Sequence, residues 1–304
     1  MLSRFSPVAK GGPFDPRFER RILGFTRPTD GSRWSYLCWK LSHRNRSLLP
    51  CLGGGNSDMV DVPVVWGSGQ MDEQDIAARK LVEFARPYLL RDDLAGLARD
   101  LDGSWSADCL ALFLESHDAE TIQVVTIALG LVGDMSACPA LLELLHRDDP
   151  RLISLAEDAL WSIWFRAAGP VAQGVLTKIA PLIHDKESDN VIPLLTSLIK
   201  TFPNFAEAYH QRSQAYSLLG RYQAAMRDAK RAIDLNPAHF GAKANMANSL
   251  VALGRYDEAL GQYEAVTKLH PHMTDIDQAI EQLSQMLSGG RKQRTSLSLV
   301  HEQD

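Results

Sequence analysis

The chain has 304 residues, of which 45% are hydrophobic and 23% are charged, and its formal net charge is −5 at pH 7. This composition is ordinary for a globular protein, and no stretch approaches the ~20 consecutive apolar residues that a membrane-spanning helix needs. The net negative charge argues against nucleic acid as the main partner.

Residues 1–70 differ from the rest of the chain in charge and in pattern. They hold ten Lys/Arg against five Asp/Glu, whereas residues 71–200 hold eleven against twenty-one. Glycine and proline interrupt every periodic segment before Met71. We expect a disordered basic segment here. The sequence leaves open whether it is a functional arm, a targeting peptide, or upstream sequence before a true start at Met71.

The four cysteines, Cys38, Cys51, Cys109 and Cys138, form no C-x-x-C pair. Free thiols in a reducing compartment are therefore expected, with no disulfide framework. His270 and His272 flank Pro271 without a third ligand nearby in the sequence. The sequence thus predicts no metal site and no cofactor.

From Met71 onward the pattern is helical, and residues 71–187 carry a period of 31 residues. Leu110 corresponds to Leu141, and Asp118 corresponds to Asp149, which precedes Pro150 as a helix cap would. No alternating pattern long enough for a sheet occurs between 71 and 290. The fold class is predicted to be all-α.

The segment VVTIALGLVGDMSACPALLELL resembles the short HEAT-like repeats of bacterial proteins, which include bilin lyase subunits. The resemblance covers roughly residues 76–166 and implies stacked pairs of helices. Trp161, Trp164 and Phe165 follow in an aromatic cluster. Core packing at a junction between repeat types is the favoured interpretation of this cluster, and a partner-binding hot spot is the alternative.

Residues 188–288 follow a second period, of 34 residues. It relates residues 206–239 to residues 240–273, and a segment ending at Pro203 precedes them as a degenerate half repeat. The positions that recur in both units are predicted to shape the repeat: Gly220, Tyr222, Ala225, Pro237, Gly254, Tyr256, Ala259 and Pro271. Glycine permits a left-handed turn or a close approach, and proline closes the second helix.

This unit resembles the tetratricopeptide repeat, a helix-turn-helix motif that stacks into a solenoid. The resemblance implies an α-solenoid of helical hairpins in which HEAT-like repeats precede tetratricopeptide repeats. Residues 274–288 keep four apolar residues on one face, as a capping helix does. Residues 289–304 are expected to form a flexible tail.

In that family the first helices of successive repeats line the concave face, which binds partners. The positions carried over to this sequence are Glu207, His210, Gln214, Ser217, Asn245, Asn248 and Val251. These side chains also fit a solvated face without a partner, and the sequence does not separate the two interpretations.

Some family members clamp a C-terminal carboxylate with lysine, asparagine and arginine on these helices. Here His210 and Gln214 replace the first lysine and asparagine, while Asn245 matches. Asp275 and Ala279 stand where cations are needed. The resemblance therefore does not predict a carboxylate clamp.

No phosphate-binding loop and no H-E-x-x-H motif occurs in the sequence, and we expect no catalytic residues. The predicted function is a non-catalytic, cytoplasmic scaffold that binds a protein or peptide. One alternative is an accessory subunit of a lyase or chromophore-handling enzyme, which rests on fold analogy alone. The other is nucleic-acid or membrane-surface binding through the basic N-terminal arm.

Overall fold

The computed structural model describes residues 73–183 and 188–301. Within these ranges all regular structure is helical, which confirms the all-α prediction. The expectations for residues 1–70 fall outside the described part of the chain. None of the described helices is long and apolar enough to span a bilayer.

The N-terminal half begins with a long helix, which two short helices and then a long, a short and a long helix follow. Aspartate and serine side chains cap four of them by accepting a hydrogen bond from a backbone N–H, at Asp93, Ser106, Asp118 and Asp149. The helices of this half are α3 (Glu73–Leu90), α4 (Leu94–Leu101), α5 (Ala107–Leu112), α6 (Ala119–Val132), α7 (Cys138–Leu144) and α8 (Pro150–Arg166).

The 31-residue period corresponds to a repeated structural unit. Leu110 and Leu141 are both fully buried, and Asp118 and Asp149 both cap the longer helix of their pair. The side chain of Arg166, at the end of α8, donates hydrogen bonds to three backbone carbonyls at the C-terminus of α6. Successive units are therefore joined by polar contacts as well as by packing.

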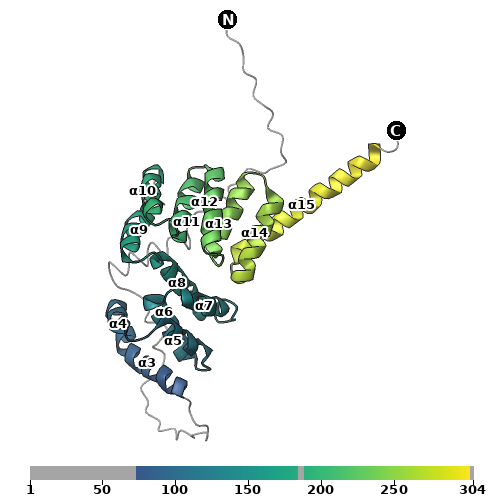
Figure 1. Ribbon diagram of the computed structural model, residues 1–304. Coiled ribbons are helices and arrows are strands. Elements are labelled where there is room, and N and C mark those ends of the chain that lie inside the picture. The colour runs from purple at the N-terminus through teal and green to yellow at the C-terminus, as the bar shows by residue number, and fades with distance from the viewer. Residues whose placement is uncertain (1–72, 184–187, 302–304) are drawn as a thin grey trace.

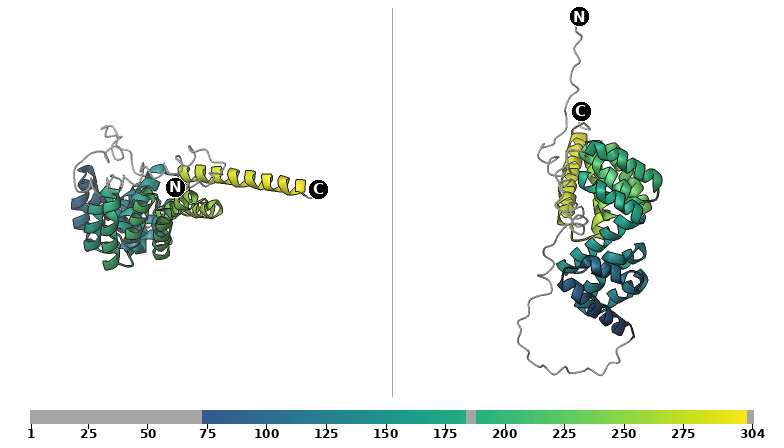
Figure 2. Two further views of the ribbon diagram at one scale, coloured as in Figure 1. Left: turned by 90° about the horizontal axis from the view of Figure 1, so that it is seen from above. Right: turned by 90° about the vertical axis from the view of Figure 1, so that its left-hand side faces the viewer.

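The C-terminal half is a row of antiparallel helices that lie side by side (Figures 1 and 2). Ala225 and Ala259 are both fully buried, so the two helices of each 34-residue unit approach closely. Tyr222 and Tyr256 begin the second helices, and Pro237 and Pro271 follow the residues that end them. The helices are α9 (Pro170–Ile183), α10 (Ser188–Thr201), α11 (Ala206–Leu218), α12 (Tyr222–Leu235), α13 (Phe240–Ala252), α14 (Tyr256–Leu269) and α15 (Thr274–His301).

The backbone conformation of the two turns explains why glycine occupies positions 220 and 254. Gly220 and Gly254 have φ of +70° and +75°, in the left-handed region. A Cβ atom added to either would meet no atom within 4 Å. Of the two reasons that the sequence offered for these glycines, the left-handed turn is therefore correct, and the close approach is wrong.

We expect Gly254→Val to lower the free energy of unfolding by about 1–3 kcal/mol, because a β-branched residue is strained at positive φ. The same substitution at Gly261, within α14, is the control, because a Cβ there also meets nothing within 4 Å and the backbone is helical. Urea denaturation followed by circular dichroism measures the midpoint of unfolding of each variant. Equal midpoints for the two variants would contradict the assignment of strain.

The last helix is longer than the sequence suggests. α15 runs from Thr274 through His301, so the helix continues where the sequence predicts a flexible tail from residue 289. Its first part behaves as the predicted cap, because Ile276, Ala279 and Leu283 are buried. Figure 2 shows the rest of α15 projecting beyond the row of helices. Gly289 and Gly290 lower helix propensity but do not end the helix.

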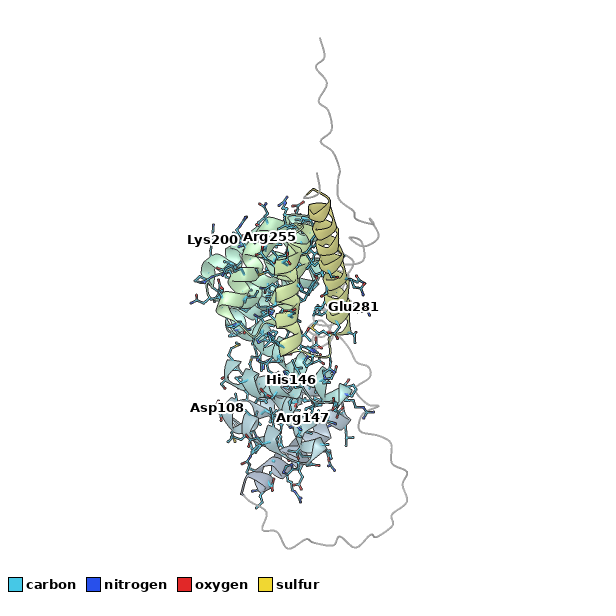
Figure 3. The ribbon with its side chains drawn as sticks, turned by 90° about the vertical axis from the view of Figure 1, so that its right-hand side faces the viewer. Asp108, His146, Arg147, Lys200, Arg255 and Glu281 are labelled. Carbon is cyan, nitrogen blue, oxygen red and sulfur yellow. The ribbon has the colours of Figure 1, made fainter. Side chains whose placement is uncertain are left out.

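The apolar core forms two clusters. One includes Phe165 and Phe205 and lies within α8 to α11. The larger joins the helices from α3 to α8 directly to α13, α14 and α15, with Trp164 and Phe240 among its members. Charged side chains such as Asp108, Lys200, Arg255 and Glu281 lie outside on the surface (Figure 3).

Candidate partner-binding face and the buried junction beside it

Most of the predicted groove residues are buried. Glu207 and His210 are 1% exposed, and the other buried members of the set are Ser217, Asn245 and Val251. Gln214 and Asn248 are partly exposed. The expectation that the whole set forms an accessible polar face is therefore wrong for five of its seven residues.

Asn245 belongs to a polar network inside the stack. Its side-chain amide donates to Ser213 Oγ at 2.6 Å, and its carbonyl oxygen accepts from Ser217 Oγ at 3.1 Å. Ser249 Oγ lies 3.3 Å from Ser217 Oγ. These contacts join α11 to α13, so the asparagine that matches a carboxylate clamp holds two successive repeats together.

Asn248 also has an internal partner. Tyr263, on α14, donates its hydroxyl hydrogen to Asn248 Oδ1. Burial raises the pKa of Tyr263, so the phenol stays protonated and keeps this bond. Asn248 keeps its amide N–H groups for other acceptors.

Helix α8 covers the first turns of α11 and α13. The ring of Trp161 lies 5.6 Å from the ring of His210 and 5.5 Å from that of Phe240, measured between centroids. Trp164 stacks on His239 at 4.5 Å. Trp164 and Phe165 are buried, which confirms that this aromatic cluster packs a junction between the two halves.

Gly241 makes room for this packing. A Cβ atom at Gly241 would lie 2.5 Å from Trp161 Cη2, too close for any other residue to fit without a shift. Gly241 stands one 34-residue period after Glu207. The tryptophan ring therefore occupies space that a side chain fills in the preceding repeat.

Three ionisable side chains meet beneath the tryptophans. His239 Nε2 lies 2.9 Å from Glu207 Oε2, and both side chains are fully buried. Gln211 donates to the other oxygen of Glu207 at 2.6 Å. Burial alone would raise the pKa of Glu207, but the hydrogen bonds from His239 and Gln211 act in the opposite direction, and the pKa is lowered.

His210 stands next to this pair. Burial and the neighbouring His239 lower the pKa of His210 to about 3, so the ring is neutral. Neither of its ring nitrogens has a hydrogen-bond partner. The position where a carboxylate clamp needs a cation is thus neutral and covered by Trp161. Asp275 is exposed and Ala279 is buried, so α15 supplies no cation at the predicted places either.

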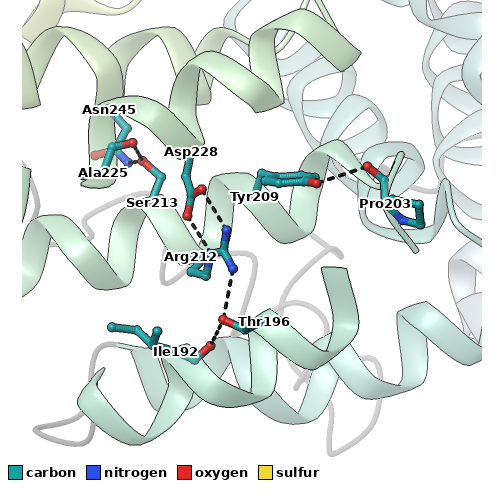
Figure 4. A network of polar contacts seen from close by, with 9 residues as sticks. All are labelled: Ile192, Thr196, Pro203, Tyr209, Arg212, Ser213, Ala225, Asp228 and Asn245. Carbon is teal, nitrogen blue, oxygen red and sulfur yellow. Dashed lines mark hydrogen bonds and ion pairs between the residues drawn. The ribbon is translucent and has the colours of Figure 1, made fainter. Parts of the chain in front are cut away.

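On the other side of α11, Arg212 forms the network drawn in Figure 4. It donates to both carboxylate oxygens of Asp228 at 2.6 and 2.9 Å, and to Thr196 Oγ1 at 3.0 Å. Arg212 thereby ties α10 and α12 to α11. The two charges stand 16 residues apart on the neighbouring helices α11 and α12, and no short-range sequence pattern predicts their contact.

Residues 218–283 match the family model of the tetratricopeptide repeat. Residues 218–283 are thus a segment of the tetratricopeptide type. The match starts at the end of α11 and takes in α12, α13, α14 and the first part of α15. It does not reach residues 76–166, so the HEAT-like interpretation of that part stays a prediction.

Three similar proteins place these tetratricopeptide repeats in context. A TPR repeat-containing protein of Rhizobium etli is 26% identical over 109 residues, which cover 36% of this chain and 53% of that protein. Serine/threonine-protein phosphatase 5 of Homo sapiens is 30% identical over 116 residues, which cover 38% of this chain and 23% of that protein. The solved first TPR of Spaghetti (RPAP3) bound to an HSP90 peptide is 24% identical, covers 38% of this chain and 93% of that chain, and has a TM-score of 0.38. The chain spans about half or less of the two curated relatives, so the similarity concerns their repeats.

Proposed function

We propose that this chain is a non-catalytic, cytoplasmic scaffold that binds a protein segment along α11 and α13. The observation that carries the proposal is a strip of the repeat surface that the junction leaves open. Gln214 and Leu218 lie one helical turn apart on α11, and Ala244 and Asn248 do so on α13. All four are at least partly exposed, with Leu218 at 40%.

The chemistry of this strip suits an extended or helical peptide. Leu218 and Ala244 offer apolar contact, and the amides of Gln214 and Asn248 offer hydrogen bonds. The first turns of α11 and α13 lie under Trp161. The proposed ligand is therefore an internal segment rather than a chain end held by its carboxylate.

A charge placed in the strip tests this function. We expect Gln214→Arg combined with Leu218→Asp to cut the amount of each specific partner recovered by affinity capture by about tenfold or more, because interface anchors contribute roughly 1–3 kcal/mol. Quantitative mass spectrometry of captures from the native organism measures the change. Folding should persist, since neither residue is buried.

Gln223→Arg is the matched control. Gln223 is exposed on α12, the second helix of the same repeat, and its variant should recover partners as the parent does. Removing residues 1–70 should also leave binding intact. Retention of every partner by the strip variant, together with their loss on truncation, would refute the proposal in favour of the N-terminal arm.

A further inference from the structure

Glu207, His210 and His239 form a compact group of potential ligands. One side-chain ligand atom from each lies within 4.8 Å of the other two. Glu207 and His210 project from the first turns of α11, three residues apart and hence on one helix face. His239 is the N-cap residue of α13. All three residues are buried.

His210 is a buried polar side chain without a hydrogen-bond partner, and this needs a physical explanation. Buried polar atoms are nearly always hydrogen-bonded, and an exception needs a physical cause such as an ion. His210 is 1% exposed, and neither ring nitrogen has a partner. The buried carboxylate of Glu207 adds a negative charge, which is costly in the interior unless a cation compensates it.

We propose that Glu207, His210 and His239 bind a divalent transition-metal ion of the zinc class. Two imidazoles and one carboxylate are a donor set that zinc accepts, with bond lengths of roughly 2.0–2.2 Å. The 2.9 Å between Glu207 Oε2 and His239 Nε2 is a hydrogen-bond distance, so the two atoms must separate to about 3.3–3.6 Å to bind one tetrahedral ion at these bond lengths. The fourth position is left for a water molecule.

Binding has two identifiable costs. The backbone N–H of Ala242 donates to His239 Nδ1 at 3.2 Å, so the neutral ring carries its proton on Nε2. A metal on Nε2 moves that proton to Nδ1, which ends the bond from Ala242 and also the bond from His239 to Glu207 Oε2. Two hydrogen bonds are exchanged for three metal–ligand bonds, one of which satisfies His210, whose ring nitrogens have no partner without the ion.

The ion would connect two repeats at the point where α8 meets them. Its ligands come from α11 and α13, and Trp161 lies against both histidines, at 5.6 Å from His210 and 5.3 Å from His239. Since the site does not exist in the unfolded chain, metal binding adds directly to folding stability. The role is therefore structural, and it is independent of the function proposed above.

The test is titration of the metal-free full chain with ZnCl2 by calorimetry and with CoCl2 by visible absorption. We expect one strong equivalent per chain, a cobalt spectrum without a thiolate charge-transfer band, and a thermal midpoint that zinc raises and EDTA restores. X-ray absorption of the zinc-loaded parent should show imidazole ligands and no sulfur. Weak binding without a defined stoichiometry, or sulfur ligation, would overturn the proposal.

Two variants and a control locate the site. Glu207→Gln and His210→Leu should each weaken zinc binding by at least about tenfold, as even partners of metal ligands cost 10–100-fold when removed. His210→Leu should leave the metal-free protein as stable as the parent or more stable, because it removes two unpaired buried nitrogens. His272→Ala, at an exposed histidine, should bind zinc as the parent does. Parent-like affinity in both site variants refutes the assignment, and the absorption spectrum decides it if either fails to fold.

Discussion

We expect Trp164→Ala to lower the free energy of unfolding by about 3–5 kcal/mol, the usual cost of removing a large aromatic side chain from a core. Trp164 is 2% exposed and packs on His239 and Phe240 across the junction between the two halves of the chain. The cavity cannot easily collapse, because its walls belong to separate helical pairs. Urea denaturation monitored by circular dichroism measures the loss.

Trp105→Ala is the matched control. Trp105 is partly exposed and contacts Phe113 edge-on at 5.8 Å, so its removal should cost clearly less. If the two substitutions cost the same, the burial of Trp164 at the junction would not be what stabilises the protein.

The second large effect concerns Arg212. We expect Arg212→Ala to destabilise the protein by about 3 kcal/mol, the lower end for breaking a buried ion pair, because Asp228 is left without its partner. The two side chains are 15% and 12% exposed, so some solvent screening remains. Thermal and urea denaturation measure the change.

A double substitution distinguishes the loss of the Arg212–Asp228 ion pair from the loss of the other contacts that the Arg212 side chain makes. Arg212→Met combined with Asp228→Leu should recover most of the stability, since apolar replacement of both partners is often neutral. Arg221→Ala, which breaks the exposed pair with Asp189, should cost at most about 1 kcal/mol. A double variant as unstable as Arg212→Ala would show that the guanidinium acts mainly through Thr196 or through packing.

The elements that the sequence predicts well are those fixed by local rules. The 34-residue spacing of Gly220 and Gly254 predicts two equivalent turns, and both glycines have positive φ. Pro237 lacks an amide hydrogen and follows the end of α12. The aspartates Asp118 and Asp149 cap helices as their position before a periodic segment indicates. Each of these features needs only a few neighbouring residues.

The candidate face was harder to predict because it depends on a contact between distant segments. Family positions place His210 on a concave surface, but α8 reaches that position with Trp161, 49 residues earlier in the chain. The signal available in the sequence was Gly241, which lacks a side chain where the preceding repeat has Glu207. Glu207-x-x-His210 on one helix was a second signal, but His239 joins it only through the stacking of repeats.

The larger core has a consequence for how the chain folds. In a linear repeat array each unit touches only its neighbours, so distant units can fold and unfold separately from one another. Here the core of α3–α8 continues directly into α13–α15 without including α9 to α11, and only Met226 of α12 packs against it. The contacts between α3–α8 and α13–α15 join residues that are far apart in the sequence. Such contacts raise the contact order and slow folding relative to a simple solenoid. The same contacts couple the two halves, so that neither set of repeats should lose its packing while the other keeps it.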